Sequence, residues 1–425
     1  MQLKRASIRK TLAAMTATLV GSTAAHAAGG HSETSLLIYS ERDRVRATEG
    51  NFSLTKPIKS DYTLSLRLTF DGLTGATPTG RSPSKYPQTL TRASGGKTIT
   101  VPAGEFPVDE YFKDTRFAAE ASLARPLGRK TTGSVGAAAS SERDYKSIGV
   151  NGGLTREFNR NNTTLGLAAA YTRDVITPVG GFYEPFSVFG EELDEDRDDR
   201  LARFAGKSKR VTDLVFSLTQ VLDRMTVVRM NFSRSHASGY QTDPYKIISV
   251  VQPPDSADAG EPTRDLYERR PDTRSKYAVY VELRRQIAGC ATSIASRYFW
   301  DDWGIESYSI DLATRLGIGK RGALQPRLRW YRQAQADFYA PFLVDGRPLP
   351  EYASADGRLS QFYAITSGIT WSVPVSERSY VNITTEYYLQ RGDSSPPPEY
   401  GSQLTFDLFP KLDVVMLRLG YARDL

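Results

Sequence analysis

The chain has 425 residues, of which 40% are hydrophobic and 24% charged, and its mean hydropathy of −0.41 is that of a polar protein. Because no segment approaches the roughly 18 consecutive apolar residues that a membrane-spanning helix needs, such helices are excluded. The formal net charge is +7, but the first 27 residues carry four positive charges and no negative one, so the remainder carries only +3. This weak excess does not indicate a nucleic-acid partner, and we predict none.

The N-terminus has the pattern of a secretory signal peptide. Four basic residues lie between positions 4 and 10, an apolar core follows from Leu12 to Val20, and Ala25-His26-Ala27 is a small-x-small cleavage site. We therefore predict a signal peptide over residues 1–27 and a single domain over residues 28–425. Cys290 is the single cysteine, so an internal disulfide is excluded even though export leads to an oxidising compartment.

The first expected elements are a weakly patterned hairpin and a strongly patterned strand. Residues 36–48 and 51–58 are the two arms of the hairpin, with the turn at Glu49-Gly50. From Tyr62 to Phe70, leucine and aromatic residues alternate strictly with polar ones, which is the lipid-out, lumen-in pattern of a membrane barrel strand. We expect this strand to end at Asp71 and a loop of about 40 residues, rich in Gly, Pro, Ser and Thr, to follow.

Six further hairpins are predicted between residues 116 and 391, where pairs of alternating segments are separated by short runs of turn residues. Their turns are expected at 126–129, 159–162, 223–224, 288–289, 319–322 and 374–378. With a last strand over residues 415–421, the chain has about sixteen strands, within a range of roughly 14 to 18. We predict an all-β fold, a transmembrane antiparallel up-and-down β-barrel with long external loops and short periplasmic turns. Both termini are expected in the periplasm, and the localisation in the bacterial outer membrane.

The hairpin over residues 359–391 distinguishes a membrane barrel from a soluble sandwich. On its first arm Tyr363, Ile365 and Trp371 share one face, while Thr366 lies on the other. Aromatic residues at the ends of the apolar face are typical of the interfacial girdles of membrane barrels, and the opposite face is small and polar. We therefore expect Ile365 to face lipid and Thr366 to face the lumen.

Charged residues on the inner face are the candidate functional residues. The lumen-lining residues that we predict are Arg67, Arg229, Glu282, Arg284, Arg297, Asp311, Arg315, Arg327, Arg329 and Glu386. The two signs are nearly balanced over the inner face, which suits either a salt-bridged wall or a weakly selective aqueous path. Arg327 and Arg329 share one strand and should favour anions, unless Asp311 and Glu282 neutralise both.

Acidic residues at the outer ends of strands are weak candidates for a cation site. They are Asp71, Glu142, Asp144 and Asp174, with Asp301, Asp337 and Asp393 in similar positions. Such a rim could bridge divalent cations to lipopolysaccharide or fold loops around a calcium ion, since hard cations prefer several carboxylate oxygens. The alternative is turn chemistry, because aspartate side chains bond their own backbone at strand ends.

Enzymatic constellations are poorly supported. After the signal peptide only His31 and His236 remain, which excludes a histidine metal cluster, and no cofactor is predicted. Ser235 and His236 suggest a hydrolase pair, but adjacent residues of a strand point to opposite faces. We predict no catalytic residue and no enzyme, and a barrel-embedded hydrolase is the less favoured alternative.

Three short segments carry a family resemblance: Phe70–Pro78, Ser141–Ser147 and Asn162–Leu165. With them the sequence resembles an uncharacterised family of Gram-negative outer-membrane β-barrels, filed as a domain of unknown function, over the whole chain after the signal peptide. The resemblance implies genes near flavin-transferase and thioredoxin-like proteins, and hence periplasmic redox or metal traffic. It supplies no catalytic residue. Many barrels end on an aromatic residue that serves as the assembly signal, and we expect Tyr421 to take that role for the barrel-assembly machinery.

Two functions follow as hypotheses. The first is a channel or porin-like protein for small polar solutes, based on the polar, charged inner face. The alternative is a non-conducting scaffold for a periplasmic or surface partner in redox or metal handling, based on the long loops and the balanced charges. Outer-membrane lipid and lipopolysaccharide are the expected surroundings in both.

Overall fold

The structure is a computed structural model that describes residues 29–42, 44–59, 61–91, 98–190, 197–392, 398–409 and 411–425. The expected signal peptide over 1–27 and the rim residue Asp393 lie outside the described residues. None of the helices in the described ranges is long and apolar enough to cross a membrane.

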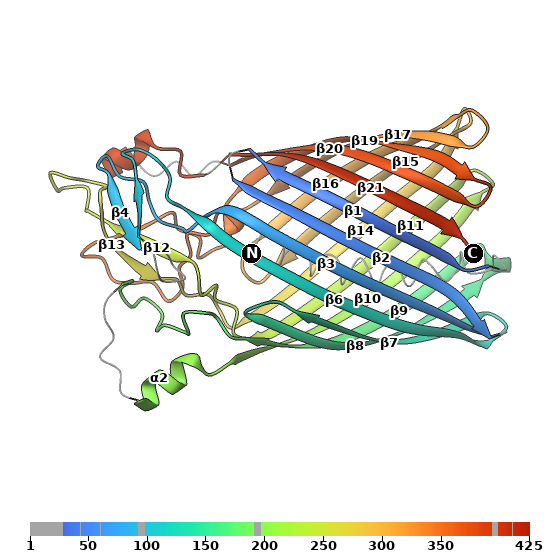
Figure 1. The fold of residues 1–425 in the computed structure, drawn as a ribbon, viewed down its shortest axis with the longest axis horizontal. Coiled ribbons are helices and arrows are strands. Elements are labelled where there is room, and N and C mark those ends of the chain that lie inside the picture. The colour runs from blue at the N-terminus through green and yellow to red at the C-terminus, as the bar shows by residue number, and fades with distance from the viewer. Residues whose placement is uncertain are drawn as a thin grey trace.

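The described chain forms a closed barrel of sixteen strands, which confirms the predicted fold class (Figure 1). In order around the barrel the strands are β1 (His31–Glu41), β2 (Val45–Lys59), β3 (Tyr62–Pro78), β6 (Val108–Gly128), β7 (Thr131–Ser141), β8 (Tyr145–Phe158), β9 (Thr163–Ile176), β10 (Lys207–Asp223), β11 (Thr226–Gly239), β14 (Thr273–Ile287), β15 (Cys290–Asp301), β16 (Glu306–Ile318), β17 (Gly322–Gln333), β19 (Phe362–Ser376), β20 (Ser379–Gly392) and β21 (Leu412–Asp424). Each strand pairs antiparallel with its neighbours, and β1 closes the barrel against β21, with His31 opposite Asp424. This is a barrel of the bacterial outer-membrane type, the class of strand structure that can span a bilayer because closure leaves no edge unpaired.

The two ends of the barrel differ (Figure 1). Tight turns and both ends of the described chain lie at one end, while the longer connections gather at the other. The turns expected in the six hairpins between residues 116 and 391 are found within a residue or two of their predicted positions. In the turn between β14 and β15, Ala288 and Gly289 both have positive φ, of 49° and 83°, as a two-residue hairpin turn with the right twist requires. Short turns mark the periplasmic end of such barrels, so the longer connections are external.

Three expectations for the strand ends are wrong. Glu49 and Gly50 lie within β2, and the first connection joins the end of β1 at Glu41 to the start of β2 at Val45, at the external end. Asp71 does not end its strand, since β3 continues to Pro78 and β6 begins at Val108. External connections are not all long, because β1 and β2, β7 and β8, and β15 and β16 are joined by only a few residues. Polar inner-face residues in these strands mimic turn and loop composition, which explains the errors.

The outer face of the barrel is apolar and bounded by aromatic residues. At the external end Tyr277, Trp300, Tyr298 and Tyr308 form a row of stacked rings across β14, β15 and β16, with neighbouring ring centroids 4.6–5.4 Å apart. Towards the other end, Trp371 is 50% exposed on the same outer face. This is the interfacial girdle expected of a membrane barrel.

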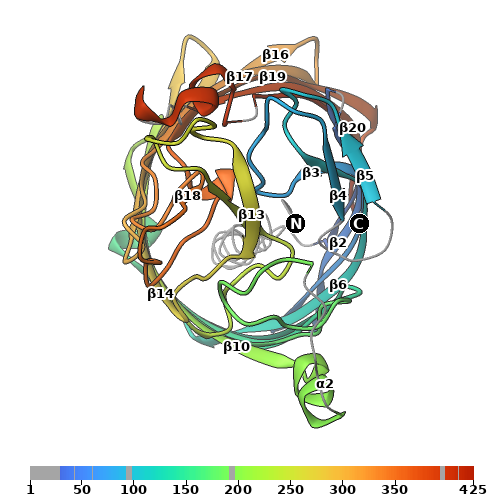
Figure 2. The same cartoon turned by 90° about the vertical axis from the view of Figure 1, so that its left-hand side faces the viewer.

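The external connections form a compact cap. They contain β4 (Gln88–Thr91) paired with β5 (Thr98–Val101), and a sheet of β12 (Ile247–Val251), β13 (Pro262–Tyr267) and β18 (Leu343–Val344). They also contain the helix α2 (Arg197–Phe204) and the 3-10 helices η2 (Gly357–Leu359) and η3 (Pro398–Thr405), while η1 (Asn159–Asn161) is a turn at the opposite end. All five residues of β12 are buried, and two clusters of buried apolar residues give the cap a core of its own. Seen from the external end, β4, β5, β13 and β18 lie over the mouth of the barrel (Figure 2).

Candidate functional site

The lumen is the candidate site, and the strand register assigns side chains to it. Residues directly opposite one another in neighbouring strands share a face, and the face carrying Arg67 can be followed from strand to strand around the barrel. All the predicted lumen-lining residues lie on this inner face: Arg67, Arg229, Glu282, Arg284, Arg297, Asp311, Arg315, Arg327, Arg329 and Glu386. Thr366 lies opposite Arg329 on the inner face, while Ile365 lies opposite Trp330 on the outer face.

Charge is segregated within the lumen rather than mixed. The inner face of β14–β17, which we call the basic wall, carries Arg274, Lys276, Arg284, Arg297, Arg315, Arg327 and Arg329 against Glu282, Asp301 and Asp311. The acidic wall, from β1 to β9, carries Glu33, Glu41, Glu49, Asp71, Asp114, Glu120, Glu157 and Asp174 against Arg67 and Arg116. In the sixteen-strand order, β16 lies opposite β6, so the two walls face each other across the lumen.

Some arginine side chains of the basic wall are paired with carboxylates in the described part of the chain, and Arg329 is not among them. Arg327 donates to Asp311 at 3.0 Å and to Glu386 at 2.9 Å. Glu282, expected as a partner of Arg327 or Arg329, instead pairs with Arg229 at 3.6 Å and Arg284 at 2.9 Å. Among the described residues, Arg329 has no carboxylate partner. Neutralisation therefore applies to Arg327 and does not apply to Arg329.

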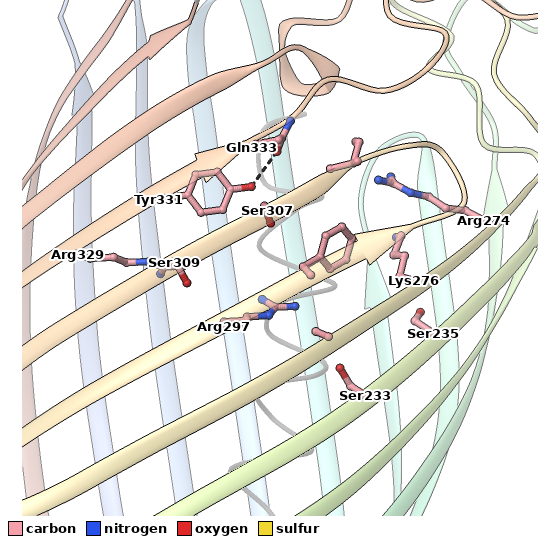
Figure 3. A pocket seen from close by; sticks show the side chains of 13 residues that line it. Ser233, Ser235, Arg274, Lys276, Arg297, Ser307, Ser309, Arg329, Tyr331 and Gln333 are labelled. Atoms are coloured by element: carbon pink, nitrogen blue, oxygen red, sulfur yellow. Dashed lines mark hydrogen bonds between the residues drawn. The ribbon is translucent and has the colours of Figure 1, made fainter.

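A pocket opens on the inner face of the basic wall, at its external end below the cap (Figure 3). Its volume is about 120 Å³. It is lined by Ser233, Ser235, Arg274, Lys276, Ala278, Arg297, Phe299, Ile305, Ser307, Ser309, Arg329, Tyr331 and Gln333. Arg297 and Arg329 were predicted from the sequence to line the lumen, whereas Arg274 and Lys276 were not. Tyr280, Glu282 and Arg284 alternate along the inner face of β14, and extending this alternation to the start of the strand would have placed Arg274 and Lys276 on the same face.

The pocket wall is tied to the cap through one hydrogen-bonded chain. The Tyr331 hydroxyl donates to Gln333 Oε1 at 2.8 Å. Gln333 Nε2 in turn donates to the backbone carbonyls of Arg358 at 3.0 Å and Ser360 at 2.9 Å, both in the β17–β19 connection. Because Gln333 is buried, these bonds fix the outer end of β17 against the cap.

Buried ionic groups hold the β11–β14 and β17–β19 connections together in the cap. Arg270 donates to Glu268 at 3.0 Å and to Asp356 at 2.9 Å, while Arg358 donates to Asp356 at 2.6 Å and to Asp243 at 2.9 Å. Burial alone would raise the pKa of Asp356, but the positive charges of Arg358, Arg270 and Lys246 hold this pKa well below its ordinary value. Burial raises the pKa of Glu268.

The β3–β6 connection is joined to the same cap. Arg81 donates to Asp265 at 2.7 Å, and the Ser84 hydroxyl donates to Glu261 at 2.6 Å. From the β20–β21 connection, Gln403 Nε2 donates to the carbonyls of Pro83 at 2.9 Å and Gly260 at 2.8 Å. Four external connections are therefore joined by contacts between residues far apart in the sequence.

The candidate cation ligands do not form one rim. Asp71 and Asp174 are buried inner-face residues, paired with Arg116 at 2.6 Å and Lys209 at 3.1 Å. Glu142 and Asp144 gather instead with Asp114, with one ligand oxygen from each within 4.8 Å of the others. The cation site stays a prediction.

Two further sequence features can be placed. Asp301 Oδ1 accepts the backbone N–H groups of Trp303 and Ile305, both at 3.0 Å, which is the turn chemistry given as the alternative to a cation site. Ser235 is buried on the inner face, whereas His236 lies on the outer face, where its Nδ1 is 3.0 Å from Ser275 Oγ. Ser235 and His236 are therefore not brought together.

Several solved structures resemble this fold at low sequence identity. The ferric enterobactin receptor of Pseudomonas aeruginosa in complex with enterobactin gives a TM-score of 0.43 at 11% identity, covering 86% of this chain and 54% of its own. The siderophore receptor PirA from Pseudomonas aeruginosa gives 0.43 at 10% identity, covering 92% and 62%. CymD, a monoaromatic hydrocarbon channel, gives 0.40 at 8% identity, covering 93% and 88%. The chain spans about half the length of the first receptor.

Comparison with protein families gives one match. The profile of a family described as "Protein of unknown function (DUF3570)" matches residues 6–423. No curated protein matches the chain.

Proposed function

The chain belongs to this family, in agreement with the resemblance of its motifs, and we propose that it is an outer-membrane channel for small polar solutes. The observation that carries the proposal is the segregation of charge in the lumen. A wall that only braced the barrel would pair its charges, whereas Arg329 on the basic wall has no carboxylate partner among the described residues. Opposed walls of opposite sign create a potential across the lumen that attracts and orients charged solutes.

In this proposal the cap narrows the external entrance. Its connections are held by buried ion pairs, and the pocket at the end of the basic wall lies directly below. Solutes would pass the cap, meet the basic wall and leave at the end with tight turns. Size exclusion would then come from the cap, and charge preference from β14–β17.

Liposome swelling tests this function. Liposomes containing the purified, folded protein should swell in isotonic solutions of small polar solutes, and the rate should fall as solute size rises. Heat-unfolded protein, recognised by its shifted mobility in electrophoresis, is the control. A folded barrel that causes no swelling with any solute would contradict the proposal.

The second candidate is a non-conducting scaffold for a periplasmic or surface partner, such as a redox or metal-handling protein. It is favoured by the cap, because four external connections tied to one another are consistent with a sealed mouth. Under this alternative the swelling assay is negative, and a periplasmic thioredoxin-like or flavin-bearing protein is retained by the barrel on purification. Swelling without such a partner would exclude it.

A further inference from the structure

Three basic side chains gather on the outer face of the barrel, at its external end. Arg173 on β9 shares the outer face with Tyr171 and lies directly opposite Arg210 on β10. Lys146 on β8 lies opposite Val175, one step along the same face of β9 from Arg173. All three basic side chains are exposed. We call Lys146, Arg173 and Arg210 the external basic cluster.

The length of β8 places this cluster at the edge of the membrane. Arg156 lies on the same outer face of β8, ten residues after Lys146 and near the opposite end of the strand. Ten residues span about 34 Å along a strand, or about 26 Å along the barrel axis at a tilt of about 40°. This is the height of the apolar band of a membrane barrel, roughly 25 Å. Lys146 therefore lies at the depth of the lipid headgroups in the external leaflet, and Arg156 at the periplasmic boundary. The outer-face residues between them are apolar or glycine: Ile148, Val150, Gly152 and Leu154.

The positive charge of the cluster is not compensated within the described part of the chain. None of its three side chains is paired there with a carboxylate. Like charges directly opposite each other on neighbouring strands, such as Arg173 and Arg210, are destabilising. On the outer face of β20 and β21, by contrast, Arg391 donates to Asp413 at 3.0 Å. The cluster therefore calls for an anion from its surroundings.

The neighbouring helix provides a second, independent indication of a lipid surface. Leu201 and Phe204 lie three residues apart, on one face of α2, and are 63% and 46% exposed. α2 projects beyond the barrel wall at the external end (Figure 1 and Figure 2). It ends at Phe204, and β10, which carries Arg210, begins at Lys207. Exposed apolar side chains of a helix in this position suit the boundary between headgroups and acyl chains.

We propose that the external basic cluster binds the phosphate groups of a phosphorylated glycolipid in the external leaflet. The Cα atoms of Arg173 and Arg210 are about 5 Å apart, so both guanidinium groups can contact one phosphate through charge-assisted hydrogen bonds. Lys146 is then available to a second phosphate, and the acyl chains lie against the apolar outer face of β8–β10. Lipopolysaccharide is the lipid of this chemistry among the expected surroundings. The site differs from an acidic rim bridged by cations, and it stands whether or not the lumen conducts.

Lipid binding to the purified barrel tests this site. Diphosphorylated lipid A is the probe, added to the folded barrel in a non-ionic detergent, and bound lipid is counted by native mass spectrometry. Saturable binding is expected. Phosphatidylglycerol and inorganic phosphate should each bind at least about tenfold more weakly, because the first carries a single phosphodiester charge and the second has no acyl chains. Dephosphorylated lipid A should also bind more weakly, since it leaves the arginines without an anion.

Substitutions assign the binding to the cluster. Arg173→Gln and Arg210→Gln should each weaken lipid A binding by about tenfold or more, as the loss of a charged hydrogen bond implies. The matched control is Arg156→Gln, which removes an exposed arginine from the same outer face at the periplasmic end and should bind lipid A like the unaltered barrel. In lipid-free detergent Arg173→Gln should raise the melting temperature, because it removes the repulsion between opposite arginines.

The inference is overturned if the folded barrel does not bind lipid A, or if the Arg173, Arg210 and Arg156 variants bind it equally well. Equal binding of phosphatidylglycerol would show a site for any anionic lipid, and equal binding of inorganic phosphate a site for a free anion; either result removes the glycolipid. A lower melting temperature of lipid-free Arg173→Gln would show that Arg173 has a partner within the chain. Heat-modifiable mobility of each variant shows that it is folded.

Discussion

Replacing Asp356 by asparagine tests whether buried charge holds the cap together. Its side chain is 3% exposed and accepts hydrogen bonds from Arg270 and Arg358, which come from different connections. Asp356 is the carboxylate that both arginines contact, so Asp356→Asn removes the negative charge that Arg270 and Arg358 share.

Removing one partner of a buried pair costs about 3 to 5 kcal/mol. Asparagine preserves the shape and some hydrogen bonds of Asp356, so we expect the lower end of that range. This corresponds to a rise of roughly a hundredfold in the fraction of open cap. The control is Asp345→Asn, whose partner Arg264 is 2.8 Å away with the two side chains 35% and 41% exposed. An exposed pair of this kind contributes only about 0 to 1 kcal/mol.

Hydrogen exchange of residues 240–272 and 334–361 measures the opening of the cap while the barrel strands serve as an internal reference. Asp356→Asn should accelerate exchange in both segments and leave β14–β17 unchanged. Because the folded-state pKa of Asp356 is depressed, its stabilisation is complete above about pH 5 and is lost progressively as pH falls towards that pKa. The difference between the variant and the unaltered protein should therefore shrink between pH 5 and pH 3. Equal exchange in the Asp356 and Asp345 variants at pH 7 would refute the reasoning.

Two further predictions concern the wall. Ile365→Arg should destabilise the folded barrel by about 2 to 4 kcal/mol if the residue lies near the bilayer midplane, whereas Thr366→Arg adds a charge to the aqueous face and should fold normally. Reversible unfolding from lipid vesicles measures the stability of both variants, and equal stability would show that the assignment of faces is wrong. Arg329→Glu should shift the reversal potential towards that of the cation with little loss of stability. Arg327→Glu should lower the melting temperature, because it places a third carboxylate beside Asp311 and Glu386. Identical effects of the two substitutions would contradict the ion pairing of Arg327 with Asp311 and Glu386.

Much of the barrel could be predicted from the sequence because each strand has its own local pattern of alternating apolar and polar residues. Period-two alternation and turn chemistry were sufficient for the number of strands and for turns such as Ala288-Gly289. The bounds of β2 were wrong because its inner face is polar: Asn51 donates to Glu49 at 2.6 Å and accepts from Thr69 at 2.8 Å, and this polar stretch with Gly50 resembles a turn.

The cap and the pocket could not be predicted in the same way. Arg270 and Asp356 are 86 residues apart, and Arg358 and Asp243 are 115 apart, so no local pattern links them. The inner-face charges were identified one by one, but their segregation depends on the order of strands around a closed barrel. In the closed barrel this order places β16 opposite β6, so the two walls face each other.

The most direct test of the central claim is the reversal potential of the purified barrel in a planar bilayer with a salt gradient. The charged lumen predicts an ion current through the unaltered barrel, and Arg329→Glu should displace the reversal potential towards that of the cation by an amount that shrinks at high salt as the charges are screened. A folded barrel that carries no current, or a reversal potential that Arg329→Glu leaves unchanged, would contradict the claim.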